Sequence, residues 1–317
     1  NRNCAFCAIP IMRGKQRSRS IESLVAEAER LAGEGVKELN LISQDTINYG
    51  VDLGIRGGLS SLLRALVKVP DIRWIRPFYL YPQQVTDDLL DLYAGEEKIT
   101  KYIDMPLQHI NDRMLKRMHR LGNRAAIEKL VDRIRTRIPG VTFRTAFIVG
   151  FPGETEKTYQ ELKSYVAESG FDRVAAFLYS DEEDTTAVSL DDKIERSVME
   201  ERRNELLAIQ EGIASGRGQD RIGSVLEVLV EGPSEETPLL LEGRHEGLAP
   251  EIDGVVYIND EPDLLTRPPR ASSDPPTPRL PRQALLHRDA PRPVPGDLVK
   301  VEITDAAAYD LVGHIVS

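Results

Sequence analysis

The sequence contains few cysteines and no long apolar run. Only two of its 317 residues are cysteine, three positions apart at Cys4 and Cys7. Two thiols so close together cannot form the disulfide framework of a secreted domain, so a metal or redox role is expected. No stretch approaches the roughly 18 uninterrupted apolar residues that span a bilayer, and the first residues carry no export signal. We therefore expect a cytoplasmic protein with no membrane partner.

Positive charge is also scarce. The 41 Lys and Arg residues are outnumbered by 51 Asp and Glu, which gives a formal net charge of −10. An acidic surface repels phosphate backbones unless basic residues gather in one patch, so nucleic acid is an unfavourable partner and a basic protein suits better. The composition, 41% hydrophobic and 29% charged, is that of a globular protein, and the length suggests two domains.

Strand-like and helical segments alternate from about residue 20 to 180, which is typical of an α/β fold with a mostly parallel sheet. Counting a strand just before Asn1, about six strand–helix units are predicted. These are too few for a closed eight-strand barrel, so we expect a partial (β/α)6 barrel over residues 1–216, closed by a helix at about 191–215. The other predicted elements are strands at 38–43, 73–80, 103–107, 141–149 and 173–179, and helices at 21–32, 59–67, 85–93, 112–118, 124–138 and 155–169.

The last part of the chain, residues 217–317, has a different pattern. Its five short strand-like runs predict a small all-β barrel. They lie at 225–230, 239–242, 255–258, 298–303 and 309–316. Between the third and fourth runs, residues 263–295 hold nine of the chain's 20 prolines and almost no helix or strand period. This segment is predicted to be a disordered insert in the barrel.

The Cys4-Ala5-Phe6-Cys7 run is a Cys-x-x-Cys pair, a spacing that zinc, redox and iron–sulfur sites share. The pair is also compatible with two buried thiols that have no function. A cysteine immediately before Asn1 would extend the pattern to Cys-x-x-x-Cys-x-x-Cys. The pair alone leaves these alternatives open.

The cysteine segment, continued as Ala8-Ile9-Pro10 and followed by the basic residues of 13–19, resembles the radical S-adenosylmethionine methylthiotransferases. Five further segments match this family: 40–45 (NLISQD), 79–82 (YLYP), 105–112 (MPLQHIND), 147–155 (FIVGFPGET) and 177–180 (FLYS). The C-terminal barrel resembles the TRAM domain, an OB-like barrel. The resemblance covers nearly the whole chain except the proline-rich insert.

The resemblance implies a 4Fe-4S cluster held by three cysteines, of which Cys4 and Cys7 would be two. Its fourth iron would bind S-adenosylmethionine, and an electron from the cluster would cleave this cofactor to a 5′-deoxyadenosyl radical. The third cysteine and an N-terminal domain carrying a second 4Fe-4S cluster are absent from the sequence. We therefore expect this chain to be inactive alone.

The resemblance and the position of strand ends also give candidate site residues, although no catalytic residue is assigned. Phe6 would lie beside the adenine, or else be a core aromatic. The residues expected at or near strand ends, where such sheets collect ligand contacts, are Gln44, Asp45, Gln108 and Arg144. Gly150 and Gly153 would let the backbone approach the adenosine, or would only form a turn.

The charged side chains outside these positions give weaker signals. The basic residues Arg13, Lys15, Arg17 and Arg19 would neutralise the cluster, the cofactor carboxylate or an acidic target, or would form a solvated loop. His109 is a family marker. The other four histidines show no ligand spacing and are expected to be structural or exposed; they are His119, His245, His287 and His314.

Two branches of the family differ in substrate: one modifies adenosines of transfer RNA, and the other an aspartate of small-subunit ribosomal protein S-twelve. Residues 221–317 without 263–295 hold 14 acidic and three basic residues, a balance of −11. An RNA-binding barrel needs the opposite sign, whereas an acidic barrel complements a basic ribosomal protein. The segments 230–237, 249–254 and 309–313 also resemble the ribosomal-protein branch.

We therefore expect methylthiolation of the aspartate β-carbon, with an electron donor and a sulfur source as further partners. The alternatives are a transfer-RNA adenosine methylthiotransferase, a non-catalytic remnant that binds a ribosomal partner, and a zinc-bound cysteine pair.

Overall fold

The computed structural model describes residues 3–237, 239–259 and 292–316, which form two compact units, 1–217 and 218–317. Residues 263–291 of the predicted insert lie outside the described residues. Among the described helices, none combines the length and apolar character needed to cross a bilayer.

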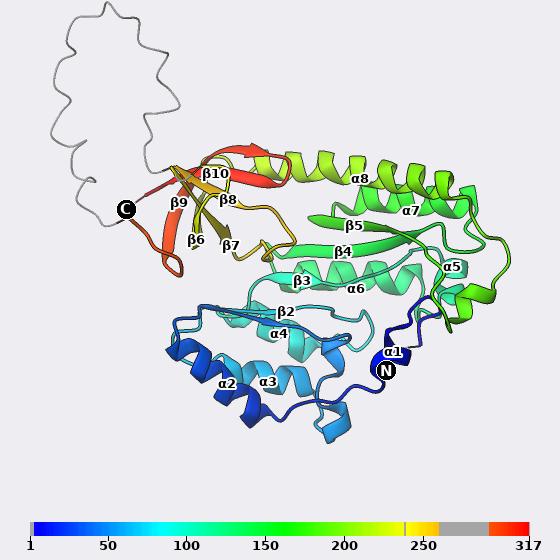
Figure 1. The fold of residues 1–317 in the computed structure, drawn as a ribbon, viewed down its shortest axis with the longest axis horizontal. Coiled ribbons are helices and arrows are strands. Elements are labelled where there is room, and N and C mark those ends of the chain that lie inside the picture. Colours follow the sequence, from blue (N-terminus) through cyan, green and yellow to red (C-terminus); the bar gives the residue numbers. More distant parts are fainter. Residues whose placement is uncertain (1–2, 238, 260–291, 317) are drawn as a thin grey trace, which may run out of the picture. The chain divides into compact units, whose positions relative to one another are not determined.

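The first unit alternates helices and strands along the chain (Figure 1). Its strands are β1 (Glu38–Leu41), β2 (Trp74–Pro77), β3 (Tyr102–Asp104), β4 (Thr142–Val149) and β5 (Arg173–Leu178). Its helices are α1 (Ile9–Arg13), α2 (Ile21–Gly33), α3 (Gly58–Leu66), α4 (Asp87–Gly95), α5 (Asp112–Arg117), α6 (Arg124–Arg137), α7 (Glu156–Ser169) and α8 (Arg196–Gln219). Three short 3₁₀ turns, η1 (Thr46–Asn48), η2 (Val51–Leu53) and η3 (Thr186–Ser189), complete the unit.

The five strands follow one another in space in the order of the chain, and every pairing is parallel. β1 pairs with β2, and β3 with β4 and β5. The segment before β3 joins the two groups, because Ile75 donates its N–H to the carbonyl of Lys98 at 2.7 Å and accepts that of Thr100 at 3.1 Å. The predicted parallel, partial-barrel fold is confirmed, and the carboxyl ends of all five strands lie along one edge.

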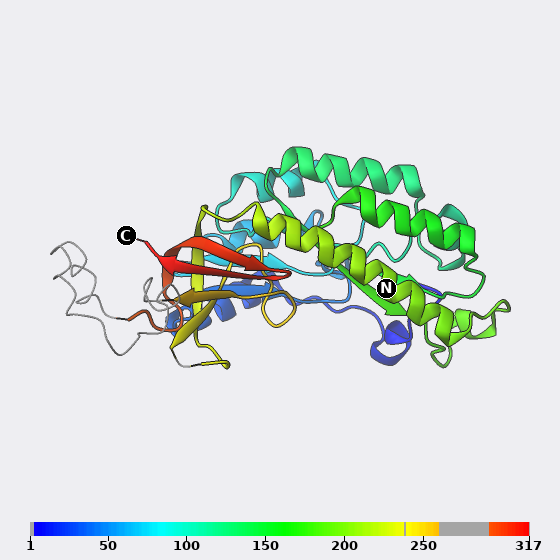
Figure 2. The same ribbon diagram turned by 90° about the horizontal axis from the view of Figure 1, so that it is seen from above.

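Helices pack against the sheet through the apolar faces predicted from their period. Five helices begin at a polar residue whose side chain accepts a backbone N–H of the first turn: Ser20, Thr86, Asn111, Asn123 and Thr155. α7 and α8 lie side by side in both views (Figures 1 and 2), and the Tyr159 hydroxyl joins them by donating to Glu205 at 2.6 Å.

Several predicted boundaries were wrong near the strand ends. The first two predicted strands were extended to residues 43 and 80, but β1 ends at Leu41 and β2 at Pro77. Beyond β2 the chain leaves the sheet, because Tyr79 has a left-handed φ of 55°. α8 begins at Arg196 rather than near 191, because Asp192 has a left-handed φ of 63°, which is incompatible with a right-handed α-helix. The short helix α1 was not predicted.

The second unit is a closed five-strand barrel, as predicted, and its strands follow the order β10-β8-β7-β6-β9. Its strands are β6 (Val225–Pro233), β7 (Leu240–His245), β8 (Val256–Asn259), β9 (Leu298–Ala307) and β10 (Asp310–Ile315). Fully buried aliphatic side chains such as Val228, Val256 and Ile258 fill its interior. Gly243 and Gly313 lie where a Cβ atom would strike the backbone of the neighbouring strand, so the barrel closes tightly at these two positions.

Candidate functional site

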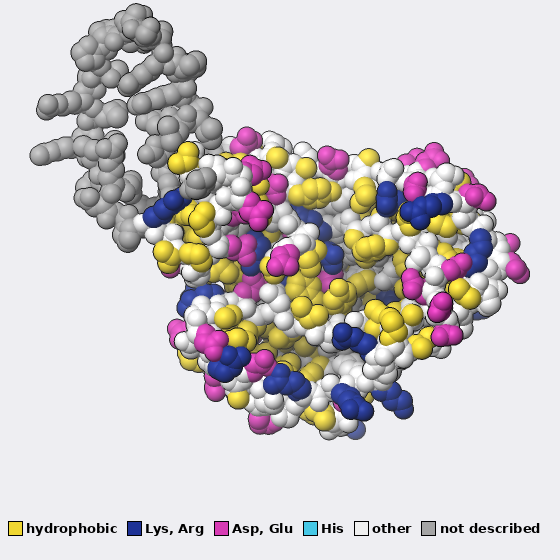
Figure 3. All heavy atoms as spheres, viewed as in Figure 1, with side chains coloured by type: hydrophobic (Ala, Val, Ile, Leu, Met, Phe, Trp, Pro, Cys, Tyr) yellow, Lys and Arg dark blue, Asp and Glu magenta, His cyan; other side chains and the backbone are white. Residues whose placement is uncertain are grey.

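A cavity of about 230 Å³ lies in the first unit, where the carboxyl ends of β1, β2 and β3 meet the cysteine loop. The face of this unit seen in Figure 3 is hollowed, and hydrophobic side chains gather in the hollow. Six of the nine predicted site residues line the cavity: Cys4, Phe6, Cys7, Gln44, Asp45 and Gln108. The other lining residues are Ile9, Pro10, Arg13, Gly14, Gln16, Tyr79, Leu80, Tyr81, Pro106 and Arg120. Arg13 is the only member of the predicted basic run among them.

The cysteine loop is fixed by backbone hydrogen bonds on both sides. Ala5 donates its N–H to the carbonyl of Met118 at 3.0 Å and accepts that of Ala187 at 2.9 Å. Cys7 donates its N–H to the carbonyl of Cys4 at 3.3 Å, which closes a turn between the two thiols. Both thiols are free and half-buried. Burial raises the pKa of the Cys7 thiol, the backbone N–H of Ile9 lowers it, and Cys4 raises it again.

Phe6, between the cysteines, both lines the cavity and packs on the core. Its ring meets Phe151 edge-on at a centroid distance of 6.4 Å, and Phe151 in turn meets Tyr179 at 5.2 Å. The position of Phe6 is therefore compatible with both alternatives, because the same ring can pack on the core and face a cofactor in the cavity.

Two residues at strand ends, Tyr79 and Gln108, have a left-handed backbone conformation. Gln108 has a φ of 72°, and its backbone forms two hydrogen bonds with β4. Its N–H donates to the carbonyl of Ala146 at 2.8 Å, and its carbonyl accepts the N–H of Ile148 at 2.9 Å. The carbonyl of Tyr79 accepts the N–H of Thr46 at 3.2 Å, which ties the loop after β2 to the residue that follows Asp45. Non-glycine residues in the left-handed region persist only where the surroundings impose them, and they gather at functional sites.

Arg144 was expected at or near a strand end, on the side where such sheets collect ligand contacts, but it is the third residue of β4, near the amino end of that strand. Its Nη1 is 2.7 Å from Oδ1 of the fully buried Asp104, whose Oδ2 accepts the backbone N–H of Tyr79 at 3.0 Å. Arg144 does not line the cavity and reaches its wall through Asp104. The expectation failed because the sequence shows on which strand a residue lies, but not how far it is from the end.

Gly150 and Gly153 also lie outside the cavity lining. Gly150 has a φ of 76°, and a Cβ atom there would overlap the side chain of Met199 on α8. Gly153 has a φ of 83°, and its Cβ would lie 2.9 Å from Nε of Arg117. The local geometry gives each glycine a packing reason, and an approach to adenosine stays a prediction.

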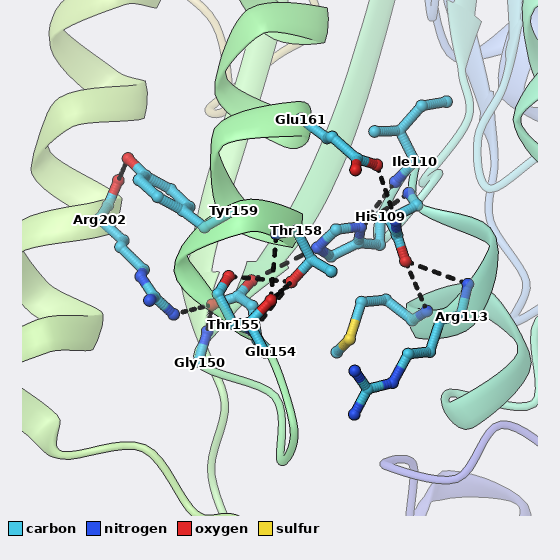
Figure 4. A network of polar contacts seen from close by, with 12 residues as sticks. His109, Ile110, Arg113, Gly150, Glu154, Thr155, Thr158, Tyr159, Glu161 and Arg202 are labelled. Carbon is cyan, nitrogen blue, oxygen red and sulfur yellow. Dashed lines mark hydrogen bonds and ion pairs between the residues drawn. The ribbon is translucent and has the colours of Figure 1, made fainter.

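A buried charged network behind the cavity was missed by the sequence analysis (Figure 4). Glu154 is at its centre: Oε2 accepts the N–H of Gly150 at 2.7 Å and lies 2.6 Å from Nη1 of Arg202 on α8. Oε1 lies 3.4 Å from Nε2 of His109, whose Nδ1 accepts the backbone N–H of Ile110 at 2.9 Å. A neutral imidazole that accepts at Nδ1 carries its hydrogen on Nε2, toward the carboxylate.

Glu154 therefore holds together the turn after β4, the loop after β3 and α8. His109 follows Gln108 directly, and Phe151 in the turn supports Phe6, so the network fixes two walls of the cavity from behind. The position of Glu154 in the FIVGFPGET segment was the available signal in the sequence.

The overlap between Gly150 and Met199 can be tested by a double-mutant cycle. We expect Gly150→Ala to destabilise the fold through the left-handed φ, which costs roughly 1–2 kcal/mol, and through overpacking, which costs about 1–3 kcal/mol. In a Met199→Ala background only the backbone cost should remain. The measurement is the free energy of unfolding of the four proteins in denaturant; equal effects of Gly150→Ala in both backgrounds would show that Met199 is not the obstacle.

Comparison with known families agrees with this architecture. Residues 1–166 match the model of the Radical SAM superfamily, and residues 222–274 match that of the TRAM domain. The chain belongs to the radical SAM superfamily. Membership implies a 4Fe-4S cluster and S-adenosylmethionine as cofactors.

The similar curated proteins narrow the resemblance to one branch. The chain is 45% identical to ribosomal protein uS12 methylthiotransferase RimO of Myxococcus xanthus over 99% of its own length and 59% of that protein. It is 46% identical to the RimO of an Anaeromyxobacter species, over 99% and 61%, and 44% identical to that of Aquifex aeolicus, over 99% and 66%. The predicted resemblance to this family and branch is confirmed. The chain spans less than two thirds of these relatives.

The residues present fit an iron–sulfur cluster as two of its ligands. Thiolates are the usual ligands of such clusters, and the two free thiols line one cavity at the ends of a tight turn. Within residues 3–237, 239–259 and 292–316, no group of three His, Cys, Asp or Glu side chains could hold a metal ion.

Proposed function

We propose that the chain is the catalytic core and TRAM barrel of an enzyme that adds a methylthio group to the β-carbon of an aspartate in ribosomal protein uS12, in the cytoplasm. The observation that carries the proposal is the single cavity that unites both cysteines with the polar residues of three strand ends. The name and substrate of the uS12 methylthiotransferase relatives support the choice of reaction.

In this proposal Cys4 and Cys7 supply two thiolates to a 4Fe-4S cluster. The bound cluster and S-adenosylmethionine supply the radical that removes a hydrogen from an unactivated carbon. Phe6, Gln44, Asp45 and Gln108 line the space next to the cysteines and would position the cofactor there. Arg144 would act through Asp104, and Gly150 and Gly153 would shape the turn behind Phe6. The apolar residues of the lining, such as Phe6, Ile9 and Leu80, would help to keep water from the reacting atoms.

The other parts of the reaction are proposed to come from outside this chain. An electron donor and a sulfur source are required, and a second 4Fe-4S cluster in a domain N-terminal to this chain would take part in sulfur supply. We place the boundary between the catalytic domain and the barrel near residue 216, close to the division of the chain into units 1–217 and 218–317.

The acidic barrel is proposed to bind the basic uS12. Exposed carboxylates such as Glu227, Glu231, Glu235 and Glu236 lie on or next to β6, while Arg244 is buried against Glu231 at 2.8 Å. The barrel therefore presents negative charge to a partner, and Arg244, one of its few basic residues, is already paired with Glu231. Electrostatic complementarity of this kind speeds association and weakens as salt is added.

The test is anaerobic iron–sulfur reconstitution of this chain beside a version with one cysteine added before Asn1, followed by reduction with S-adenosylmethionine. We expect only the extended version to hold a stable 4Fe-4S cluster and to release 5′-deoxyadenosine. If the extended version holds no cluster, the radical-enzyme proposal is wrong and a non-catalytic binding protein becomes the better reading; bound zinc in its place would identify a zinc site.

The substrate is tested separately by binding. We expect the chain to bind uS12 with an affinity that falls between 50 and 200 mM salt, and to bind transfer RNA no better than an unrelated acidic protein does. Tight transfer-RNA binding with a steep salt slope would favour the transfer-RNA branch instead.

A further inference from the structure

Arg120, just after α5, lines the cavity, and the proposed function gives it no role. Its side chain is nearly buried, with the residue 9% exposed. Nη1 lies 3.6 Å from Sγ of Cys4, and Nη2 donates to the carbonyl of Pro106 at 2.6 Å. The guanidinium also lies over the ring of Tyr81, 4.1 Å from its centroid. Three separate segments therefore fix one planar group against a cysteine sulfur.

Arg120 has no ion-pair partner among the residues that the structure describes. Three other buried arginines, Arg76, Arg144 and Arg202, are each paired with a buried carboxylate. A buried cation without a counter-charge is costly. The contacts of Arg120, a carbonyl, a ring face and a sulfur, leave its charge available to an anionic group beside Cys4.

A cluster on Cys4 is such a group, since its thiolates give it net negative charge and a one-electron reduction adds another. Reduction potentials of iron–sulfur clusters depend on net charge, solvent exposure and hydrogen bonds to the sulfurs. An N–H donor and a positive charge at a ligand sulfur both favour the reduced form. The Nη2 of the same guanidinium is held by the carbonyl of Pro106, so the Nη1 donor stays next to the sulfur of Cys4.

We infer that Arg120 is a positioning residue that hydrogen-bonds to the ligand sulfur of Cys4 and raises the reduction potential of the cluster. The inference rests on the proposed function, because it needs the cluster to be bound at the cysteine pair. It assigns a role to a residue 116 positions away from Cys4 in the chain.

The test uses the chain with the added cysteine, reconstituted and titrated electrochemically without S-adenosylmethionine while the reduced cluster is followed by electron paramagnetic resonance. We expect Arg120→Gln to shift the midpoint potential to more negative values, because both the positive charge and the planar two-donor guanidinium are lost. Arg120→Lys keeps the charge but cannot donate to Pro106 and Cys4 in the same planar geometry, so a smaller negative shift is expected. Arg113→Gln, a change at an exposed position of the preceding helix α5, should leave the potential unchanged.

Unchanged potentials in both Arg120 variants, with weaker S-adenosylmethionine binding, would overturn the inference and place Arg120 on the cofactor instead. If Arg120→Gln retains no cluster, the Arg120→Lys potential decides: a negative shift supports the inference and the parent value overturns it. Failure of the proposed function is distinguishable, because the parent protein itself would then assemble no cluster.

Discussion

Replacing Cys7 by alanine in the chain with the added cysteine is expected to abolish cluster assembly and, with it, release of 5′-deoxyadenosine. The physical reason is that a 4Fe-4S core needs thiolate ligands, and the carbonyl and N–H that close the Cys4–Cys7 turn cannot replace one. Loss of a residue that only supports a metal ligand costs roughly 10–100-fold in affinity. Loss of a ligand should exceed this.

The measurements are iron and sulfide content, the visible absorbance of the cluster, and 5′-deoxyadenosine by chromatography. Met12→Ala is the matched control, because Met12 lies near the cysteine loop on α1 but is 74% exposed. It should reconstitute like the parent. A Cys7→Ala protein with full iron content and activity would show that Cys7 is not a ligand.

The second large effect is expected at Glu154. Glu154→Gln keeps the size of the side chain but removes the charge that compensates Arg202, whose side chain is 8% exposed. Removing one partner of a buried ion pair typically costs about 3–5 kcal/mol, because the other charge stays buried without compensation. The free energy of unfolding, measured in denaturant, should fall by this amount.

The chain provides its own control for this change, since Arg202 also contacts Glu156 at 3.3 Å. The Glu156 side chain is 69% exposed, so water screens its interaction with Arg202 and Glu156→Gln should change stability little. Similar losses for both variants would show that burial does not control the strength of this network. Retained stability in Glu154→Gln would show that Gly150 and Arg202 find other partners.

Most of the fold was predictable because local patterns carry it. The apolar period of a segment such as 124–138 reports which face is buried, and alternation of such segments with strands predicts parallel pairing. Parallel pairing then places the ends of consecutive strands at one edge, and of the four residues expected at or near strand ends, Gln44, Asp45 and Gln108 line one cavity. The closed barrel of the second unit followed from its five short runs.

The failures have a common origin at the ends of elements. The chain leaves the sheet at Tyr79 and Gln108, where hydrogen bonds to residues distant in the sequence impose the backbone conformation. Tyr79 bonds to Asp104, and Gln108 bonds to Ala146 and Ile148 on β4. No local pattern encodes such bonds. Arg144 shows the same limit, since its partner Asp104 belongs to another strand.

The two domains, the order of helices and strands, and the cysteine pair with its family could be read from the amino-acid order alone, because periodicity and spacing are properties of neighbouring residues. The position of Arg120 against Cys4, and the contacts of Glu154 with Gly150, Arg202 and His109, arise only from the folded chain. These contacts depend on how distant elements pack and on the directions in which their side chains point. Both are fixed only when the whole core of a domain has formed.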